Sequence, residues 1–183
     1  MARLTVRAAI ERNYNHNQQA RVNTLTVTGD QLKAAARLYP TGVAVVTTAP
    51  EGVAPFGITV NSYTSLSLEP PLIMWNLQRS SDTFKEWHEA QTFAVNFLKA
   101  GQEDLSTRFA SQGGHQITGA ALAHGITGCP LLADCLSSLE CTIHARYEEG
   151  DHIIMIGEVV NIESPSPDAD ALVYFKRGYT SVG

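Results

Sequence analysis

Short polar side chains are concentrated between Ala54 and Pro71, and they are the groups in this sequence best suited to holding a ligand. The stretch carries hydroxyl or amide groups at Thr59, Asn61, Ser62, Thr64, Ser65 and Ser67, between the apolar residues Ile58, Val60, Leu66 and Leu68. Neutral donors of this kind bind an anionic or heteroaromatic ligand without a counter-charge, and Gly57 favours close approach of a ligand to the backbone. The alternative interpretation is an exposed strand, since these residue types also occur in strands.

A second polar group, Ser80 to Thr83, precedes the apolar residues Phe84 and Trp87 and predicts a helix start. Either Ser80 or Ser81 is expected to cap the helix, and Asp82 suits its first turn because an acid there meets the positive end of the helix dipole. A helix start rich in hydroxyl groups is also a ready place for a phosphate, because its free N–H groups point outward.

His152 is the best single candidate for a catalytic polar group, because it follows an acidic turn at the start of an apolar strand. It either presents its imidazole to a ligand or makes a local hydrogen bond to Asp151. The sequence contains no P-loop, no G-x-S-x-G and no G-x-G-x-x-G, so a nicotinamide cofactor, if used, is not bound by a Rossmann motif.

The three cysteines, Cys129, Cys135 and Cys141, form no C-x-x-C and cannot all be paired. We interpret them as reduced thiols of an intracellular protein, with Cys141 in the core, and expect no metal. A zinc site built from these cysteines with His124 or His144 is the alternative.

The composition is that of one globular domain. The chain has 183 residues, of which 44% are hydrophobic and 17% charged, which is enough to bury a sizeable core. A net charge of −5 argues against a nucleic-acid surface. No apolar run approaches the roughly 18 residues of a membrane span, so we expect neither nucleic acid nor membrane as a partner.

Residues 1–27 are expected to form an N-terminal arm, ahead of a single domain over residues 28–183. The arm has four arginines against one acid, Glu11, and no apolar core of a secretory signal. An organelle transit peptide would share this composition, but we favour an extension that lies on a partner subunit.

The elements that must position these residues are mostly strands. A helix is expected to start at Thr28, with Gln31 completing a capping box, and to end at Pro40. Strands are predicted at 43–48, 72–77, 93–98, 136–147, 152–162 and 171–175, and the 72–77 strand is expected in the centre of the sheet. Short helices are predicted after Ser80 and over 101–109. Residues 111–134 are expected to form a long surface excursion. Strands dominate without alternating with helices, which predicts a mainly β fold, a closed or half-closed antiparallel barrel.

Several motifs in order resemble the flavin reductase-like family, the reductase components of two-component flavin-dependent monooxygenases. They are Pro40-Thr41-Gly42-Val43, Val45 to Thr48, Gly57 to Ser62, Ser65 to Pro71, Phe93 to Asn96, Arg108 to Ser111 and Gly150-Asp151-His152, within a similarity that runs from about Gln31 to Tyr179. The resemblance implies an FMN-binding split β-barrel that forms a homodimer. It also implies a cytoplasmic NAD(P)H:flavin oxidoreductase that uses NADH or NADPH to reduce FMN or FAD and supplies a separate oxygenase.

The resemblance also assigns residues. The flavin ring and ribityl chain are expected at Phe56, Gly57, Ile58, Thr59, Asn61, Ser62, Asn76, Leu77 and Gln78, and the phosphate at Ser81, Asp82 and Thr83, closed by Arg108 and Phe109. Nicotinamide contacts are expected at His152, Tyr174, Phe175, Lys176 and Arg177. Asp82 departs from the family pattern, because a carboxylate would repel a phosphate by roughly 1 kcal/mol at about 4 Å in water. Three explanations are open: the Asp82 side chain turns away from the phosphate, Arg79 compensates its negative charge, or FMN binds less tightly in this protein.

Two other functions are consistent with these residues. One is a non-catalytic flavoprotein that carries electrons for another protein. The other is a flavoenzyme that acts directly on an organic substrate, with the 111–134 excursion building the substrate pocket.

Overall fold

The computed structural model describes residues 27–117 and 122–183, and the chain divides into two units, residues 1–39 and 40–183. The described part of the first unit is helix α2 (Gly29–Ala36) with its flanking residues. The predicted capping box is present, because Gln31 N donates to Thr28 Oγ1 at 3.3 Å and Thr28 N donates to Gln31 Oε1 at 2.8 Å. Residues 1–26 of the predicted arm lie outside the described residues, so the boundary after residue 27 stays a prediction.

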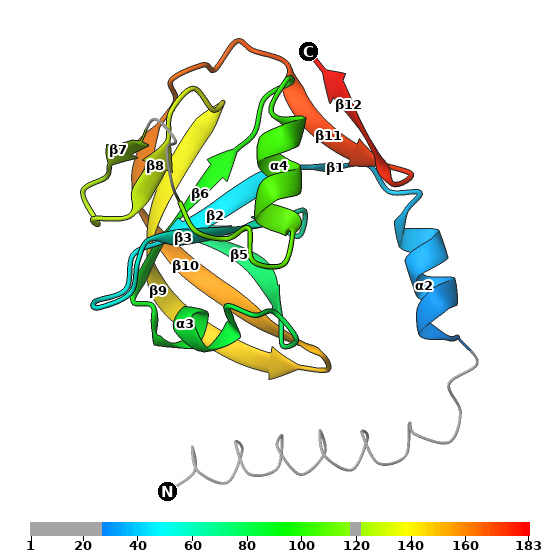
Figure 1. Ribbon diagram of the computed structural model, residues 1–183, viewed down its shortest axis with the longest axis horizontal. Coiled ribbons are helices and arrows are strands. Elements are labelled where there is room, and N and C mark those ends of the chain that lie inside the picture. The colour runs from blue at the N-terminus through cyan, green and yellow to red at the C-terminus, as the bar shows by residue number, and fades with distance from the viewer. Residues whose placement is uncertain (1–26, 118–121) are drawn as a thin grey trace, which may run out of the picture. The chain divides into compact units, whose positions relative to one another are not determined.

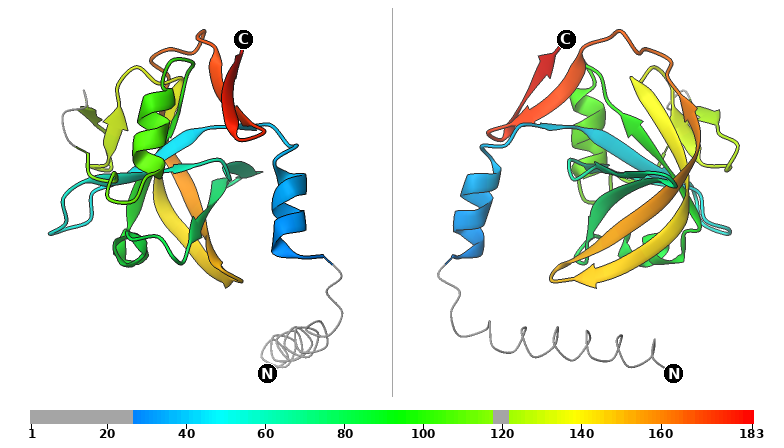
Figure 2. Two further views of the ribbon diagram at one scale, coloured as in Figure 1. Left: turned by 45° about the vertical axis from the view of Figure 1, so that its right-hand side comes forward. Right: turned by 180° about the vertical axis from the view of Figure 1, so that it is seen from behind.

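A seven-stranded antiparallel sheet forms the body of the second unit (Figure 1). In spatial order its strands are β3 (Phe56–Val60), β2 (Ala44–Thr48), β6 (Thr92–Phe97), β9 (Ser137–Glu149), β10 (His152–Glu163), β5 (Pro71–Gln78) and β4 (Thr64–Leu68). The sheet curls so that β9 and β10 cross β2 and β3 (Figure 2), and its two end strands, β3 and β4, are not paired with each other. The fold is therefore mainly β and antiparallel, as predicted, and the curled sheet is a barrel split between β3 and β4.

One strand lies in a different place from the prediction. Residues 72–77 were expected in the centre of the sheet, but β5 lies one strand from the edge, between β10 and β4. Its faces differ, since Ile73, Trp75 and Leu77 are buried while the residues between them are only half-buried. Both faces of this strand carry mostly apolar residues, so the difference in burial between them could not be read from the sequence.

Two small sheets complete the second unit. One contains β1 (Thr41–Gly42), β11 (Ala171–Phe175) and β12 (Gly178–Val182), and the other contains β7 (Leu122–His124) and β8 (Pro130–Leu132). The sequence prediction ended at β11 and missed β12. Lys176 and Arg177 form the hairpin turn between these strands, with φ of 48° and 68°, the left-handed pair of a type I′ turn.

The predicted surface excursion at 111–134 is wrong over its last part, because residues 129–132 are buried. A polar interior network holds β8 there. Asn96 Oδ1 accepts from Leu132 N at 3.0 Å and from Ser138 Oγ at 2.8 Å, while Asn96 Nδ2 donates to Val45 O at 3.0 Å. Thr47 Oγ1 donates to the Pro130 carbonyl at 2.5 Å. These contacts between distant segments give no periodic signal in the sequence.

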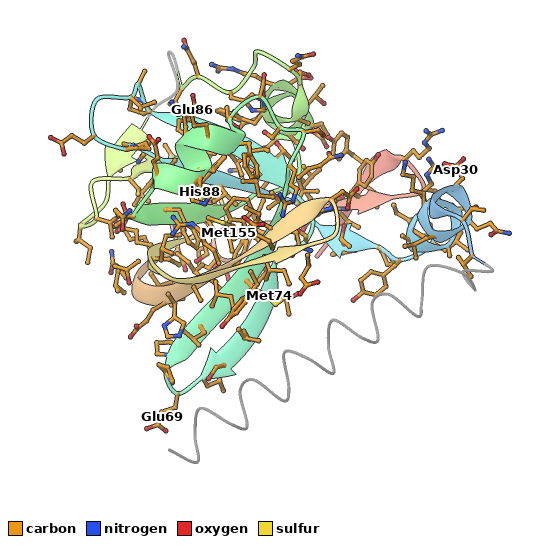
Figure 3. All side chains as sticks on the ribbon, turned by 90° about the horizontal axis from the view of Figure 1, so that it is seen from below. Asp30, Glu69, Met74, Glu86, His88 and Met155 are labelled. Carbon is orange, nitrogen blue, oxygen red and sulfur yellow. The ribbon has the colours of Figure 1, made fainter. Side chains whose placement is uncertain are left out.

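Aromatic side chains fill the main core. Trp87, from helix α3 (Phe84–Glu89), packs edge-on against Phe56 at 5.1 Å and Trp75 at 4.9 Å between ring centroids. Such aromatic pairs add about 0.5–1.5 kcal/mol beyond the area they bury. Figure 3 shows Met155 inside the unit, whereas Glu69 projects from the tip of the β4–β5 hairpin. The predicted core role of both tryptophans is confirmed.

Helix α4 (Glu103–Ala110) packs on β3 and β2 and buries Phe109. Helix α3 begins at Phe84, and its N-cap Thr83 makes no side-chain capping bond. Neither predicted serine is the N-cap of α3, but in the turn before the helix Ser81 Oγ accepts from the Thr83 N–H at 3.4 Å and contacts Thr83 Oγ1 at 3.0 Å. In the described part of the chain, none of the helices has the length and apolar character needed to span a bilayer.

Candidate functional site: a polar cavity at the split of the barrel

A cavity of about 510 Å³ lies where β3, the end of β5 and the start of β10 meet. It is lined by Ile58, Thr59, Val60, Asn61, Ser62, Asn76, Gln78, Ser80, Ser81, Asp82, Ala110, Gln112, His115 and His152. Nine of these were predicted from the sequence: Ile58, Thr59, Asn61, Ser62, Asn76, Gln78, Ser81, Asp82 and His152. The structure therefore gathers, in one place, groups that are far apart along the chain.

The cavity wall is held in place by hydrogen bonds between its own residues. The backbone N–H of Asn76 donates to Ser62 Oγ at 3.0 Å, which ties the end of β5 to the turn after β3. Thr59 Oγ1 donates to the Ser106 carbonyl at 2.7 Å and fixes α4 to β3. Asn76 Oδ1 is buried and has no hydrogen-bond partner within the described part of the protein. A buried acceptor without a partner is costly, and a donor on a ligand would satisfy it.

His152 reaches the cavity through the strand register. It is paired with Gln78 across β10 and β5, and both residues line the cavity. Its Nδ1 also lies 2.8 Å from Asp151 Oδ1, and its side chain is 42% exposed. The two interpretations of His152 are thus compatible, because the hairpin contact orients an imidazole that still faces the cavity. Its catalytic role stays a prediction.

Asp82 is held by the segment after α4. Its Oδ1 lies 2.8 Å from His115 Nε2, and its Oδ2 accepts from the Gly113 backbone N–H at 3.1 Å. Arg79, the predicted compensating cation, instead pairs with Glu148 at 2.6 Å. The partner of this carboxylate is therefore a histidine to which the sequence assigned no role.

His115 is fixed on its other side by Gly57. The Gly57 N–H donates to the His115 carbonyl at 2.8 Å, and His115 Nδ1 lies 3.1 Å from the Gly57 carbonyl oxygen. A Cβ at Gly57 would lie 3.0 Å from Val46 O and 3.1 Å from Thr47 Cγ2. The glycine was predicted to let a ligand approach the backbone, but the groups that approach it closely are β2 and His115.

Several predicted site residues do not line this cavity. Phe56, Leu77 and Phe109 are buried in the hydrophobic core, and Gly57 and Thr83 are not among the lining residues. Arg108 Nη2 donates to the Gln116 carbonyl at 2.8 Å and so braces the segment that carries His115. Phe175, Lys176 and Arg177 lie at the β11–β12 hairpin, and their predicted nicotinamide role is a prediction that the cavity geometry leaves open.

Tyr174 lines a smaller neighbouring cavity of about 210 Å³, which shares Thr59, Val60, Asn61 and Ala110 with the larger one. Its ring packs on Tyr179 at 5.5 Å between centroids, and Tyr179 Oη lies 2.9 Å from Ser106 Oγ. The two cavities are therefore adjacent, and they meet at the end of β3 and at Ala110.

Sequence reasoning missed Val60, Ser80, Ala110, Gln112 and His115 as lining residues. For His115, the sequence feature that could have indicated its position is the preceding pair Gly113-Gly114. Gly113 has φ of +74°, and a Cβ at Gly114 would lie 2.1 Å from the Arg108 carbonyl oxygen. A glycine pair with these requirements makes the tight turn that brings the next residue, His115, back to β3.

The cysteines take no part in this chemistry. All three are free thiols and buried. Burial raises the pKa of Cys141 to about 12, followed by smaller contributions from Cys129 and Glu140. A thiol of this kind is neither a nucleophile nor a metal ligand near neutral pH. Within residues 27–117 and 122–183, no group of three or more histidine, cysteine or acidic side chains could hold a metal ion.

The cavity has the properties of a site for a heteroaromatic ligand. Its volume lies within the range of about 300–1,000 Å³ typical of small-molecule sites. Its polar lining is dominated by neutral hydroxyl and amide groups, and Asn76 offers an unused buried acceptor. An isoalloxazine ring has a matching imide N–H and carbonyl oxygens, so the residues present fit a flavin.

Comparison with known proteins agrees with this chemistry. Residues 36–183 match the family model described as "Flavin reductase like domain". "FMN reductase (NADH) SmoA" of Agrobacterium fabrum is 39% identical over 137 residues, which cover 74% of this chain and 76% of that protein. Across curated relatives, the chain covers from 47% to 86% of their own length.

Solved structures show the same similarity. The Streptomyces globisporus NADH:FAD oxidoreductase SgcE6, in complex with NAD and FAD fragments, has a TM-score of 0.77 and 35% identity, covering 84% of this chain and 92% of that one. BorF, the flavin reductase component of a bacterial two-component tryptophan halogenase, has a TM-score of 0.77 and 28% identity, covering 85% and 98%. With the family model matched over the whole second unit, the chain belongs to the flavin reductase-like domain family.

Proposed function

We infer that the protein is an NADH- or NADPH-dependent flavin reductase that reduces FMN or FAD and supplies reduced flavin to a separate oxygenase component. The observation that carries this proposal is the cavity at the split of the barrel, whose neutral donors and unused Asn76 acceptor fit a flavin. The names of the relatives support the same activity, since they include NADH-dependent FMN and FAD reductases.

When bound, the two cofactors supply the chemistry themselves, which is hydride transfer from the dihydronicotinamide to the flavin ring. The protein contributes orientation and a site shielded from water. In this proposal Asn61, Ser62 and Asn76 would bind the flavin ring through neutral hydrogen bonds. His152, which contacts Asp151 and pairs with Gln78, would contact the second cofactor. None of these residues needs to exchange a proton for hydride transfer to proceed.

A homodimer in the cytoplasm is the second part of the proposal. Leu66 and Leu68 on the edge strand β4 are 46% and 88% exposed, and Ile162 on β10 is 61% exposed. An edge strand with exposed apolar side chains is a typical place for a second chain to bind. Three buried free thiols are consistent with a reducing compartment. Analytical ultracentrifugation that finds only monomers at micromolar concentration would contradict the dimer.

Turnover tests the function directly. Purified protein with NADH and excess FMN or FAD should consume NADH, measured as loss of the nicotinamide absorbance band. Asn61→Ala removes one neutral hydrogen-bonding group from the cavity and should raise the KM for flavin by about three- to tenfold. Thr142→Ala, at an exposed position of strand β9 and outside the cavity lining, is the matched control and should leave the KM unchanged.

If neither NADH nor NADPH is consumed with any flavin, this result would contradict the reductase and favour a protein that only carries electrons. Consumption of an organic compound by the flavin-loaded protein, without an oxygenase, would favour the direct flavoenzyme.

A further inference from the structure

The cavity has an unusual balance of charge for a site that accepts phosphorylated ligands. Its ionisable lining residues are Asp82, His115 and His152, and no lysine or arginine is among the residues that line it. Arg79 is paired with Glu148 at 2.6 Å. A phosphate in the cavity therefore meets a carboxylate, two histidines and neutral hydroxyl and amide groups.

His115 is built into the wall between two acceptors. Its Nε2 lies 2.8 Å from the Asp82 carboxylate and its Nδ1 lies 3.1 Å from the Gly57 carbonyl oxygen. Neither acceptor can donate, so both contacts are hydrogen bonds only when each ring nitrogen carries a hydrogen. A ring that donates at both nitrogens carries a positive charge, which offsets the charge of the Asp82 carboxylate. The side chains are 9% and 34% exposed, so the pair is shielded more than a surface ion pair.

Resting on the proposed flavin site, we propose that Asp82 and His115 determine flavin specificity by forming a neutral pair that makes the cavity indifferent to a ligand phosphate. The flavin is held through its uncharged ring and ribityl chain. Riboflavin, which lacks a phosphate, is then a substrate comparable to FMN. Asp82 is the group that would select against phosphate, and His115 is the group that cancels this selection.

The cavity is small enough for this pair to act on any phosphate inside it. A volume of about 510 Å³ corresponds to a diameter of about 10 Å, close to the Debye length at physiological ionic strength. An uncompensated charge about 4 Å from a phosphate in water changes affinity by about fivefold for each unit of phosphate charge. Removing either partner should therefore have a measurable effect, of opposite sign for the two partners.

The test measures the Kd of riboflavin and of FMN for the wild-type protein, Asp82→Asn and His115→Gln. The ratio of the two dissociation constants reports the phosphate alone, because riboflavin controls for changes in ring binding. The wild-type ratio should lie within about threefold of one. Asp82→Asn should shift the ratio toward FMN by about five- to 25-fold, and His115→Gln should shift it toward riboflavin by a similar factor. Both shifts should shrink as salt is added.

Asp134→Asn is the matched control. Asp134 is also a carboxylate paired with a cation, Lys99, at 2.6 Å, but it does not line the cavity. Its φ of 63° is tolerated by asparagine, so the substitution keeps the backbone and changes the net charge by the same amount. The wild-type ratio should persist in this variant. Circular dichroism checks that each variant is folded. If only one of the two cavity variants folds, the sign of the shift in its ratio of dissociation constants still tests the proposal.

A wild-type preference for FMN over riboflavin greater than tenfold would overturn the proposal. So would equal changes in the two dissociation constants for both cavity variants, because Asp82 and His115 would then act only as structural supports. Failure of the wild-type protein to bind any flavin is a different result, which contradicts the proposed function itself.

Discussion

Substitution of Gly114 by alanine should weaken flavin binding while leaving the barrel folded. A Cβ at this position would lie 2.1 Å from the Arg108 carbonyl oxygen and 3.1 Å from the Ser111 carbonyl oxygen. Since real Cβ contacts are essentially never under 3.0 Å, the segment must move by about 1 Å away from α4. Backbone atoms on a helix end cannot yield as a flexible side chain would.

The magnitude follows from the contacts that this movement breaks. The segment is held by the Gly57 N–H to the His115 carbonyl at 2.8 Å, by His115 Nδ1 to the Gly57 carbonyl at 3.1 Å, and by the Gly113 N–H to Asp82 at 3.1 Å. At about 0.5–1.5 kcal/mol net for each, their loss costs roughly 2–4 kcal/mol. If flavin binds only with the segment in place, its Kd rises by at least tenfold.

Fluorescence quenching of FMN measures the Kd, and circular dichroism at increasing temperature measures the Tm. Gly42→Ala is the control, because a Cβ there meets nothing within 4 Å. It should leave the FMN Kd unchanged. A Gly114→Ala protein that binds FMN with the wild-type Kd would refute the reasoning that this segment forms the cavity wall.

Three further predictions concern other parts of the molecule. Burial alone would raise the pKa of Glu140, but hydrogen bonds from Asn161, from the Thr127 hydroxyl and from the Thr127 and Ile126 N–H groups outweigh burial, so the pKa is lowered. The ionised carboxylate therefore stabilises the fold above the ordinary pKa of about 4.3. This stabilisation is lost as the pH falls through the lower pKa of the folded state. Thermal melts from pH 6 to 3 should therefore show a smaller loss of Tm for Glu140→Gln than for wild type, and equal losses would contradict this. Asn96→Leu leaves Leu132 N and Ser138 Oγ without their acceptor, so the free energy of unfolding measured in urea should fall by roughly 2–5 kcal/mol. A fall below about 1 kcal/mol would show that β8 is held by other contacts. His152→Ala should lower kcat/KM for NADH by about tenfold with little change in Tm, because its side chain is 42% exposed, and an unchanged kcat/KM would remove it from the site.

Local patterns in the sequence predicted the elements well where one residue type decides the local structure. Thr28 and Gln31 formed the capping box, and the acidic turn before His152 formed the β9–β10 hairpin. Short apolar runs bounded by turn residues predicted most strands of the sheet. The strand β12 was missed because its hairpin turn uses Lys176 and Arg177 rather than Asn-Gly.

The polar stretch after Gly57 was predicted as a ligand wall, and five of its residues, Ile58, Thr59, Val60, Asn61 and Ser62, line the cavity. His115 could not be predicted, because its role depends on contacts with Gly57 and Asp82, which lie 58 and 33 residues away in the sequence. The burial of β8 had the same origin, since Asn96 and Thr47 hold it from other strands. Long-range hydrogen bonds between single polar residues leave no periodic trace.

The central claim is that flavin binds in the cavity at the split of the barrel. A crystal structure of the protein with FMN tests it most directly. We expect isoalloxazine density against Asn61, Ser62 and Asn76, with Gln78 and His152 at its border. Density for FMN at any other place on the chain, with this cavity filled only by water, would contradict the claim.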